Sequence, residues 1–259
     1  MDDDLVLFTR DEPVAVIRVN REKKLNALNR GILDALMARL DEVAGDDALH
    51  VTILTGTGRA FCAGADIGEY WQQGLSTFAA YRRLGRLLLE RVEKHPKPVI
   101  AAVNGFTLGG GFELALACDL IVAGEQAIFG LPEPALGLVP GGGGTQRLTR
   151  AVGRYRAKEI LLSGRRLSAQ EARDWGLVSA LAPAGEEIRV ARELAGKIVQ
   201  QAPLAVRALK RLVNEGTDAA LETALSYEQQ SLIALYATAD GQEGIAAFME
   251  KRSPTFTGR

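Results

Sequence analysis

The stretch that decides the fold is residues 99–119, which read VIAAVNGFTLGGGFELALACD. Residues 99–103 form a short apolar run of the kind found in buried strands. Asn104-Gly105 indicates a turn, and residues 109–111 are three successive glycines. The glycines open a second apolar run whose single charge is Glu113. The pattern predicts a buried strand, a turn and the start of a helix.

This predicted helix start has the properties of a binding site for a negative charge. The first N–H groups of a helix have no partner within the helix, and the helix dipole favours an anion at that end. Glycine lets another molecule approach the backbone closely. A lone carboxylate one turn into an apolar helix is costly to bury unless it is paired. We therefore predict the wall of an active site, with backbone N–H groups beside an acid or base, Glu113.

The composition indicates a globular protein of one large domain, or of one domain with an appendage. The chain has 259 residues, of which 47% are hydrophobic, and its net charge is −1. Such a charge gives no electrostatic reason to expect nucleic acid or an anionic membrane as a partner. The N-terminus, MDDDLVLF, is acidic and resembles no targeting peptide. No apolar run approaches the roughly 20 residues needed to span a bilayer.

The two cysteines, Cys62 and Cys118, have no metal-type spacing and are typical of a reducing compartment. We expect a cytoplasmic protein without a metal site. Six strand patterns and several helical ones are recognisable, and no long internal sequence repeat is visible. The strand patterns are residues 5–9, 14–19, 51–55, 99–103, 120–123 and 177–181; the helical ones are 32–43, 77–93, 145–152, two pieces within 160–175 separated at Gly164, 188–201, 203–214, 218–238 and 240–251.

Two glycine-rich segments are predicted to be irregular. Residues 56–68 (GTGRAFCAGADIG) are expected to form a loop with special backbone conformations. Residues 127–144 hold three prolines and six glycines, which exclude one regular element throughout. The composition changes near Pro183. We divide the chain there into a mixed α/β core, residues 1–185, and a helical region, residues 186–259.

Several common catalytic motifs are absent from the sequence. Neither glycine run matches a P-loop or a dinucleotide fingerprint, and there is no G-x-S-x-G elbow. The only histidines, His50 and His95, have few polar neighbours in sequence, and we interpret both as structural or surface residues. Two carboxylates remain in apolar, glycine- and proline-rich surroundings, Glu113 and Glu133.

Paired carboxylates suit acid–base chemistry, because an apolar pocket raises a carboxyl pKa towards neutrality. From spacing alone two other interpretations stay open. Glu113 is then a capping or ion-paired helix residue, and Glu133, which lies between two prolines, is a solvated turn residue.

Five segments, in order and well spaced, resemble the enoyl-CoA hydratase/isomerase (crotonase) superfamily over nearly the whole chain. The resemblance implies an α/β fold in which ββα units form a spiral core. It also implies that C-terminal helices build trimers, usually paired into hexamers. The segments are LNALN (25–29), FCAGADI (61–67), KPVIAAVNGFTLGGGFELALACD (97–119), FGLPEPALGLVPGGGGTQRL (129–148) and FMEKR (248–252).

The resemblance also implies a substrate and a reaction. The substrate is an acyl-CoA thioester, and no separate cofactor or metal is needed. The N–H groups of Ala65 and Gly110 would stabilise a thioester enolate. In the hydratase branch, Glu113 would orient and deprotonate a water molecule, and Glu133 would exchange the proton at the α carbon. Water would thus add across the double bond of a 2-enoyl-CoA to give a 3-hydroxyacyl-CoA.

Coenzyme A would lie along two backbone segments, and Lys251 would reach its phosphates in a neighbouring subunit. For the two lysines of this set the alternative is a solvated surface lysine. Many hydratases have a lysine where this chain has Gly68, which would weaken one contact to coenzyme A. The implied coenzyme A residues are Lys24, Leu25, Ala27, Ala63, Asp66, Ile67, Gly68 and Lys251.

Residues 69–83 would line the acyl pocket in such a fold, or pack as an ordinary helix; the aromatic members are Tyr70, Trp71, Phe78 and Tyr81. Two alternatives to a simple hydratase remain. One is an enoyl-CoA isomerase, or a hydratase of a branched, aromatic-pathway or carnitine-type acyl group. The other is a catalytically silent relative that binds coenzyme A or RNA. The glutamate pair and the near-neutral charge weigh against the second.

Overall fold

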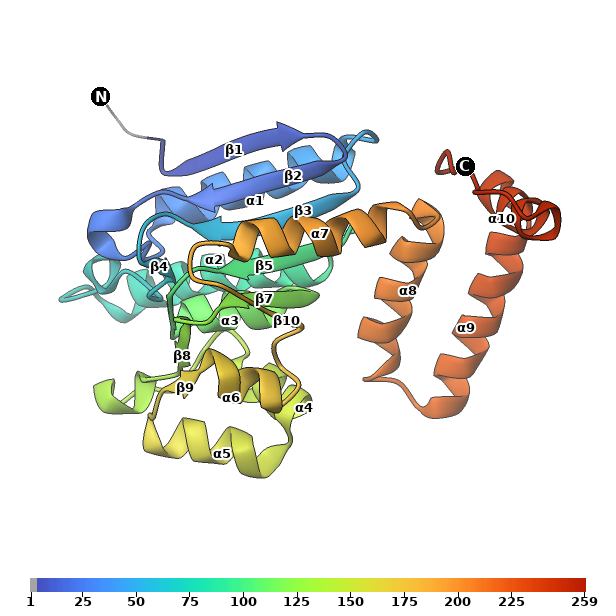
Figure 1. Ribbon diagram of the computed structural model, residues 1–259. Coiled ribbons are helices and arrows are strands. Elements are labelled where there is room, and N and C mark those ends of the chain that lie inside the picture. The colour runs from blue at the N-terminus through green and yellow to red at the C-terminus, as the bar shows by residue number, and fades with distance from the viewer. Residues whose placement is uncertain (1–3) are drawn as a thin grey trace.

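The structure is a computed structural model that describes residues 4–259. Its strands form two sheets, with helices on both faces of the larger one (Figure 1). The strands are β1 Val6–Asp11, β2 Val14–Val19, β3 Val51–Gly56, β4 Ala60–Cys62, β5 Val99–Val103, β6 Phe106–Leu108, β7 Leu120–Gly124, β8 Ile128–Gly130, β9 Leu167–Ser168 and β10 Ala180–Ala182. The α-helices are α1 Arg30–Gly45, α2 Leu75–Glu93, α3 Gly110–Ala117, α4 Gly144–Val152, α5 Arg154–Ser163, α6 Ala169–Asp174, α7 Glu187–Val199, α8 Pro203–Gly216, α9 Leu221–Tyr236 and α10 Ala239–Glu250.

The larger sheet has the strand order β1-β2-β3-β5-β7-β10. β1 and β2 form the predicted antiparallel hairpin, and the other pairs are parallel. One face packs against α1, α2 and α3, and the other against α7. Because both faces are covered, the central strands are apolar at nearly every position. This explains why residues 99–103 read as a continuous apolar run, all of it buried.

The smaller sheet, of order β4-β6-β8-β9, was not predicted. Its strands are two or three residues long and three of them lie in or beside the glycine-rich segments. The interpretation of residues 56–68 as a loop throughout was therefore wrong, because β4 occupies Ala60–Cys62. Strands this short carry no alternation that a sequence can reveal. Their pairing depends on partners far along the chain.

The two sheets are built by one repeating unit. β3-β4-α2, β5-β6-α3 and β7-β8-α4 each place their first strand in the larger sheet and their second strand in the smaller sheet. This is the ββα spiral implied by the resemblance. The repeat is one of topology, since the sequence shows no corresponding long repeat.

Several predicted helix starts are confirmed by their caps. The Asn29 side chain accepts from the backbone N–H of Ile32 at the start of α1. Ser168 and Glu171 form the capping box of α6, and Pro203 occupies the first turn of α8. The predicted break at Gly164 is also present, because this residue caps α5 in the left-handed conformation.

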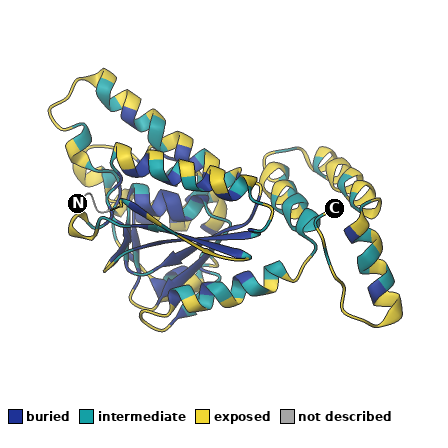
Figure 2. Cartoon of the chain, turned by 90° about the horizontal axis from the view of Figure 1, so that it is seen from above, coloured by how far each residue is buried: buried dark blue, intermediate teal, exposed yellow. Residues whose placement is uncertain are grey.

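The last three helices form an arm that projects from the core (Figure 1). In Figure 2 the central strands are dark blue, whereas the helices near the C-terminus are mostly yellow and teal. α8 is fastened to the core by Lys210, whose Nζ lies 2.8 Å from Asp119 Oδ2 with both side chains largely buried. α7 instead lies on the larger sheet. Within residues 4–259, no helix combines the length and the apolarity needed to cross a membrane.

Candidate active site

Two loops meet at the start of α3 and bring two free N–H groups together. A Cβ placed on Gly110 would lie 3.5 Å from the backbone nitrogen of Ala65, and one on Gly64 would lie 3.3 Å from the nitrogen of Gly110. Within residues 4–259, neither the Ala65 nor the Gly110 N–H donates to a protein acceptor. Two unpaired donors on touching loops form a site for a negatively charged oxygen.

Glycine is required where these loops turn. Gly109, the N-cap of α3, has φ of +51° and ψ of −126°, a conformation that side chains disfavour. Gly64 has φ of +105°, and a Cβ there would meet the carbonyl oxygen of Leu108 at 2.9 Å. The glycines thus permit both the turn and the close approach of the two loops.

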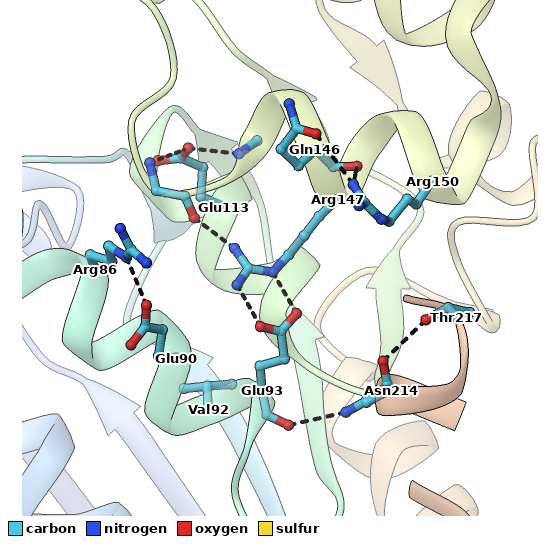
Figure 3. A network of polar contacts seen from close by, with 12 residues as sticks. Arg86, Glu90, Val92, Glu93, Glu113, Gln146, Arg147, Arg150, Asn214 and Thr217 are labelled. Carbon is cyan, nitrogen blue, oxygen red and sulfur yellow. Dashed lines mark hydrogen bonds and ion pairs between the residues drawn. The ribbon is translucent and has the colours of Figure 1, made fainter. Parts of the chain in front are cut away.

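Glu113 lies one turn into α3 and is 1% exposed. Its Oε1 accepts from the backbone N–H groups of Gly142 and Gly144, at 2.7 and 2.8 Å (Figure 3). A Cβ on Gly142 would lie 2.7 Å from Oε2 of Glu113, so the glycine-rich loop at residues 141–144 leaves room for the carboxylate. The predicted burial of this charge is confirmed, and backbone donors stabilise it.

Glu133 begins a short 3₁₀ helix, Glu133–Leu136, and its carboxyl group points back to α3. A Cβ on Gly109 would lie 3.0 Å from its Oε1, and its Oε2 is buried without a hydrogen-bond partner. Burial raises the pKa of Glu133, and the nearby Glu113 charge raises it further. Glu133 is therefore no solvated turn residue.

Two arginines face this carboxylate pair. Nη2 of Arg82, from α2, lies 3.8 Å from Oε2 of Glu113. Arg147, from α4, makes a bidentate ion pair with Glu93, with N···O distances of 2.8 and 2.7 Å (Figure 3). Arg147 also donates a hydrogen bond to the carbonyl oxygen of Gly142. Neither arginine was predicted as a site residue from the sequence. Arg82 sits in an arginine-rich amphipathic helix, where nothing in the local pattern separates it from a surface arginine.

The two predicted coenzyme A segments lie side by side. The N–H of Ala63 donates to the carbonyl oxygen of Leu25, and that of Asp66 donates to Leu28. Arg21 stabilises the two adjacent segments through an ion pair in which its Nη1 lies 2.5 Å from Oδ2 of Asp66. Burial alone would raise the pKa of Asp66, but hydrogen bonds from Arg21 and Gly68 outweigh it and lower the pKa.

Of the predicted coenzyme A residues, seven lie on these two segments and one lies elsewhere. Lys24, Ile67 and Gly68 are exposed; Leu25, Ala27, Ala63 and Asp66 are half-buried. Lys251 is the exposed C-cap residue of α10, a helix that lies away from the core in Figure 1. Its proposed contact with a neighbouring subunit stays a prediction.

Three of the four predicted acyl-pocket aromatics form one cluster. The Tyr70 ring centroid lies 5.1 Å from that of Phe78 and 5.6 Å from that of Tyr81. Tyr81 also donates to the carbonyl oxygen of Leu28 at 2.5 Å. Trp71 is 67% exposed and stands outside the cluster. His95 is buried and bonded to the carbonyl oxygens of Leu40 and Lys97, which agrees with a structural role.

An oxygen site made of two backbone donors, with one buried and one half-buried carboxyl group beside it, defines a class of enzyme site. Such a site stabilises an oxyanion while protons move at neighbouring atoms.

Comparison with known proteins identifies the family. The sequence model of the family described as Enoyl-CoA hydratase/isomerase matches residues 9–259. The chain is 42% identical to a 2,3-dehydroadipyl-CoA hydratase of Escherichia coli K12, covering 98% of this chain and 99% of that one. It is 41% identical to a short-chain-enoyl-CoA hydratase of Clostridium acetobutylicum, covering 95% of each.

A crystal structure of an enoyl-CoA hydratase from Bacillus anthracis superposes on this one with a TM-score of 0.95 and 41% identity, covering 98% of this chain and all of that one. The chain belongs to the enoyl-CoA hydratase/isomerase family. Its fold is the α/β crotonase fold, with two sheets and C-terminal helices, as the sequence predicted.

Proposed function

We propose that the protein is a hydro-lyase that adds water to 2-enoyl-CoA thioesters and forms 3-hydroxyacyl-CoA. The observation that carries this proposal is the carboxyl pair of buried Glu113 and half-buried Glu133, next to the free N–H groups of Ala65 and Gly110. Relatives at 41–42% identity that are named hydratases support it.

The two carboxyl groups have environments that suit opposite roles. Glu113 accepts two N–H bonds and faces Arg82, which favours its ionised form. Burial raises the pKa of Glu133, and one of its oxygens has no donor, which favours the protonated form. Glu113 is thus the base and Glu133 the acid, a division that follows from environment.

The proposed reaction proceeds with this division of roles. The Glu113 carboxylate takes a proton from water while the water oxygen bonds to C3 of the enoyl group. The electron pair of the double bond moves towards the thioester oxygen, where the N–H groups of Ala65 and Gly110 receive the charge. Glu133 then delivers its proton to C2. The product holds all the atoms of water, and a proton must return from Glu113 to Glu133 before the next turnover.

Replacing either glutamate tests the proposal. Glu113→Gln and Glu133→Gln should each lower kcat for crotonyl-CoA by about 10²–10⁴-fold, because each removes one proton-transfer group. Loss of the conjugated absorbance measures turnover, and calorimetry with a saturated acyl-CoA measures binding, which should persist. Glu125→Gln is the matched control, since Glu125 is exposed at the end of β7. A fully active Glu113→Gln protein would contradict the mechanism.

A panel of thioesters separates the alternatives within the family. An isomerase would convert 3-enoyl-CoA to 2-enoyl-CoA and leave crotonyl-CoA unhydrated. A specialised hydratase would prefer branched, aromatic-pathway or carnitine-type enoyl thioesters. A silent relative would bind acyl-CoA and turn over none of them.

We further propose that the segments around Lys24–Ala27 and Ala63–Gly68 bind coenzyme A, with Lys251 of a neighbouring subunit at its phosphates. The protein would then be a homotrimer or a hexamer, built by the helical region from residue 186 onward. A cytoplasmic location is also proposed, because Cys62 and Cys118 are free thiols, as expected in a reducing compartment.

A further inference from the structure

Arg82 is a cation beside the carboxylate pair, and within the described part of the chain its side chain donates no hydrogen bond to a protein acceptor. Its Nη2 lies 3.8 Å from Oε2 of Glu113, which is an ionic contact and too long for a hydrogen bond. Within residues 4–259, Glu113 is the only carboxylate found within 4.0 Å of Arg82. The Arg82 side chain is 26% exposed, so water screens this contact only in part.

The glycine-rich loop makes room for this guanidinium. A Cβ on Gly141 would lie 2.9 Å from Nη2 of Arg82 and 3.3 Å from its Nε. Gly141 does not have a positive φ, so its backbone conformation does not require glycine. The missing side chain at residue 141 therefore serves the position of Arg82.

The other charged groups around Glu113 are already paired or neutral. The elements packed against α3 are α2, α4, β4 and β6. Arg147 on α4 is held by Glu93. On β4, burial raises the pKa of the Cys62 thiol to about 12, so it stays neutral, and β6 has no titratable side chain. Besides these, the Glu133 carboxyl group lies near Glu113, with its Oε1 against Gly109. Among residues 4–259, Arg82 is thus the cation near Glu113 that has no other carboxylate within ion-pair distance, and its charge also acts to lower the pKa of Glu133, against the effect of burial.

We propose that Arg82 is a positioning residue that keeps Glu113 ionised, so that the proton held by the carboxylate pair resides on Glu133. This inference rests on the proposed hydratase function for its catalytic meaning. Its physical basis is that an opposite charge within about 4–6 Å favours the charged form of a carboxyl group, whereas a second carboxylate disfavours it. Without Arg82, the two carboxyl groups would compete for the proton with less difference between them.

The test follows the acidic limb of the pH profile of kcat/KM for crotonyl-CoA. Arg82→Met should move the midpoint of this limb to higher pH by about one unit, because the base loses its neighbouring cation. On that limb, kcat/KM should fall by about tenfold at a given pH, with a smaller loss at the optimum. Arg82→Lys keeps the charge and should show little of this shift.

Gly141→Ala is the second variant, since its Cβ would displace the guanidinium while leaving the charge in the protein. It should move the limb in the same direction as Arg82→Met and add nothing in the double variant. Arg86→Met is the matched control: Arg86 lies one turn along α2, is 73% exposed and pairs with Glu90. It should leave the profile unchanged.

A titration of ¹³C-labelled glutamate carboxyl carbons by NMR reads the charge of Glu113 directly, with its signal assigned by its loss in Glu113→Gln. The Glu113 signal should titrate at higher pH in Arg82→Met than in the unaltered protein. An unchanged titration, a loss of kcat/KM that is equal at every pH, or an equal shift in Arg86→Met would overturn the inference. If the unaltered protein hydrates no enoyl thioester, the proposed function fails, but the titration still decides the role of Arg82.

Discussion

The N–H of Gly110 is the smallest feature on which the proposed chemistry depends. It belongs to the first residue of α3, where a helix has no internal acceptor to offer, and it faces the loop that carries Ala65. The donor is a backbone atom, so most substitutions at this residue retain it. Proline alone removes it.

Gly110→Pro should therefore abolish turnover in a folded protein. Proline is tolerated in the first turn of a helix, and loss of one oxyanion donor costs about 10²–10³-fold in kcat. Gly110→Ala is the matched control, because it keeps the N–H and its Cβ would make only an ordinary 3.5 Å contact with the nitrogen of Ala65. The measurement is crotonyl-CoA turnover by the two variants, and thermal melting checks that each is folded. Equal activity in the two variants would remove Gly110 from the proposed mechanism.

Next to this residue, helix α3 packs directly against strand β4, with backbone facing backbone. A Cβ on Gly111 would lie 2.0 Å from the carbonyl oxygen of Cys62, and no flexible side chain there can move aside. Only glycine at residue 111 therefore lets the helix come this close to the short strand. This approach sets the distance between the free N–H groups of Gly110 and Ala65, since β4 leads directly into the loop of Ala65.

Gly111→Ala should consequently destabilise the protein by about 1–3 kcal/mol, the usual cost of overpacking a rigid site. Helix propensity alone would predict the opposite sign, because alanine is favoured over glycine by about 1 kcal/mol. Urea denaturation of Gly111→Ala and Gly110→Ala, compared with the unaltered chain, separates these effects. A Gly111→Ala protein as stable as its neighbour variant would show that α3 can withdraw from β4 without cost.

The arm formed by α8, α9 and α10 exposes apolar residues that a monomer leaves in water. α9 and α10 carry most of them, and large exposed apolar surfaces mark interaction sites. In the monomer a cleft of about 1300 Å³ lies between this arm and the face formed by α2 and α4. The exposed apolar side chains of the two helices are Leu221, Leu225, Tyr227, Leu232, Ile233, Tyr236, Ile245, Phe248 and Met249.

If the arm builds the proposed oligomer, a chain cut at Ala202 should elute as a monomer or aggregate in light scattering. A milder variant, Leu232→Glu with Ile233→Glu, places two charges where the side chains are now 68% and 65% exposed. It should dissociate the oligomer and leave the thermal stability of the monomer nearly unchanged, because surface substitutions cost little. A truncated chain that remains a clean hexamer would refute the proposed role of the arm.

Periodic and apolar patterns in the sequence were enough to predict the strands of the larger sheet and most of the helices. The hairpin of β1 and β2, the caps at Asn29 and Ser168 and the buried run of β5 are all local features, and each is confirmed. The smaller sheet was missed because β4, β6 and β8 have three residues each and pair only with distant partners. The predicted division of the chain near Pro183 stays a prediction.

By itself the sequence determined the family and the crotonase fold and pointed to the two glutamates as candidates, because short motifs with fixed residue types carry this information. Only the tertiary structure decided how the glutamates differ. Glu113 receives N–H bonds from a loop some thirty residues away, whereas one oxygen of Glu133 is buried without a donor. The approach of Arg82 to Glu113 likewise depends on the space left at Gly141. Charge states depend on neighbours in space, and the packing of α2, α3 and the glycine loop supplies those neighbours.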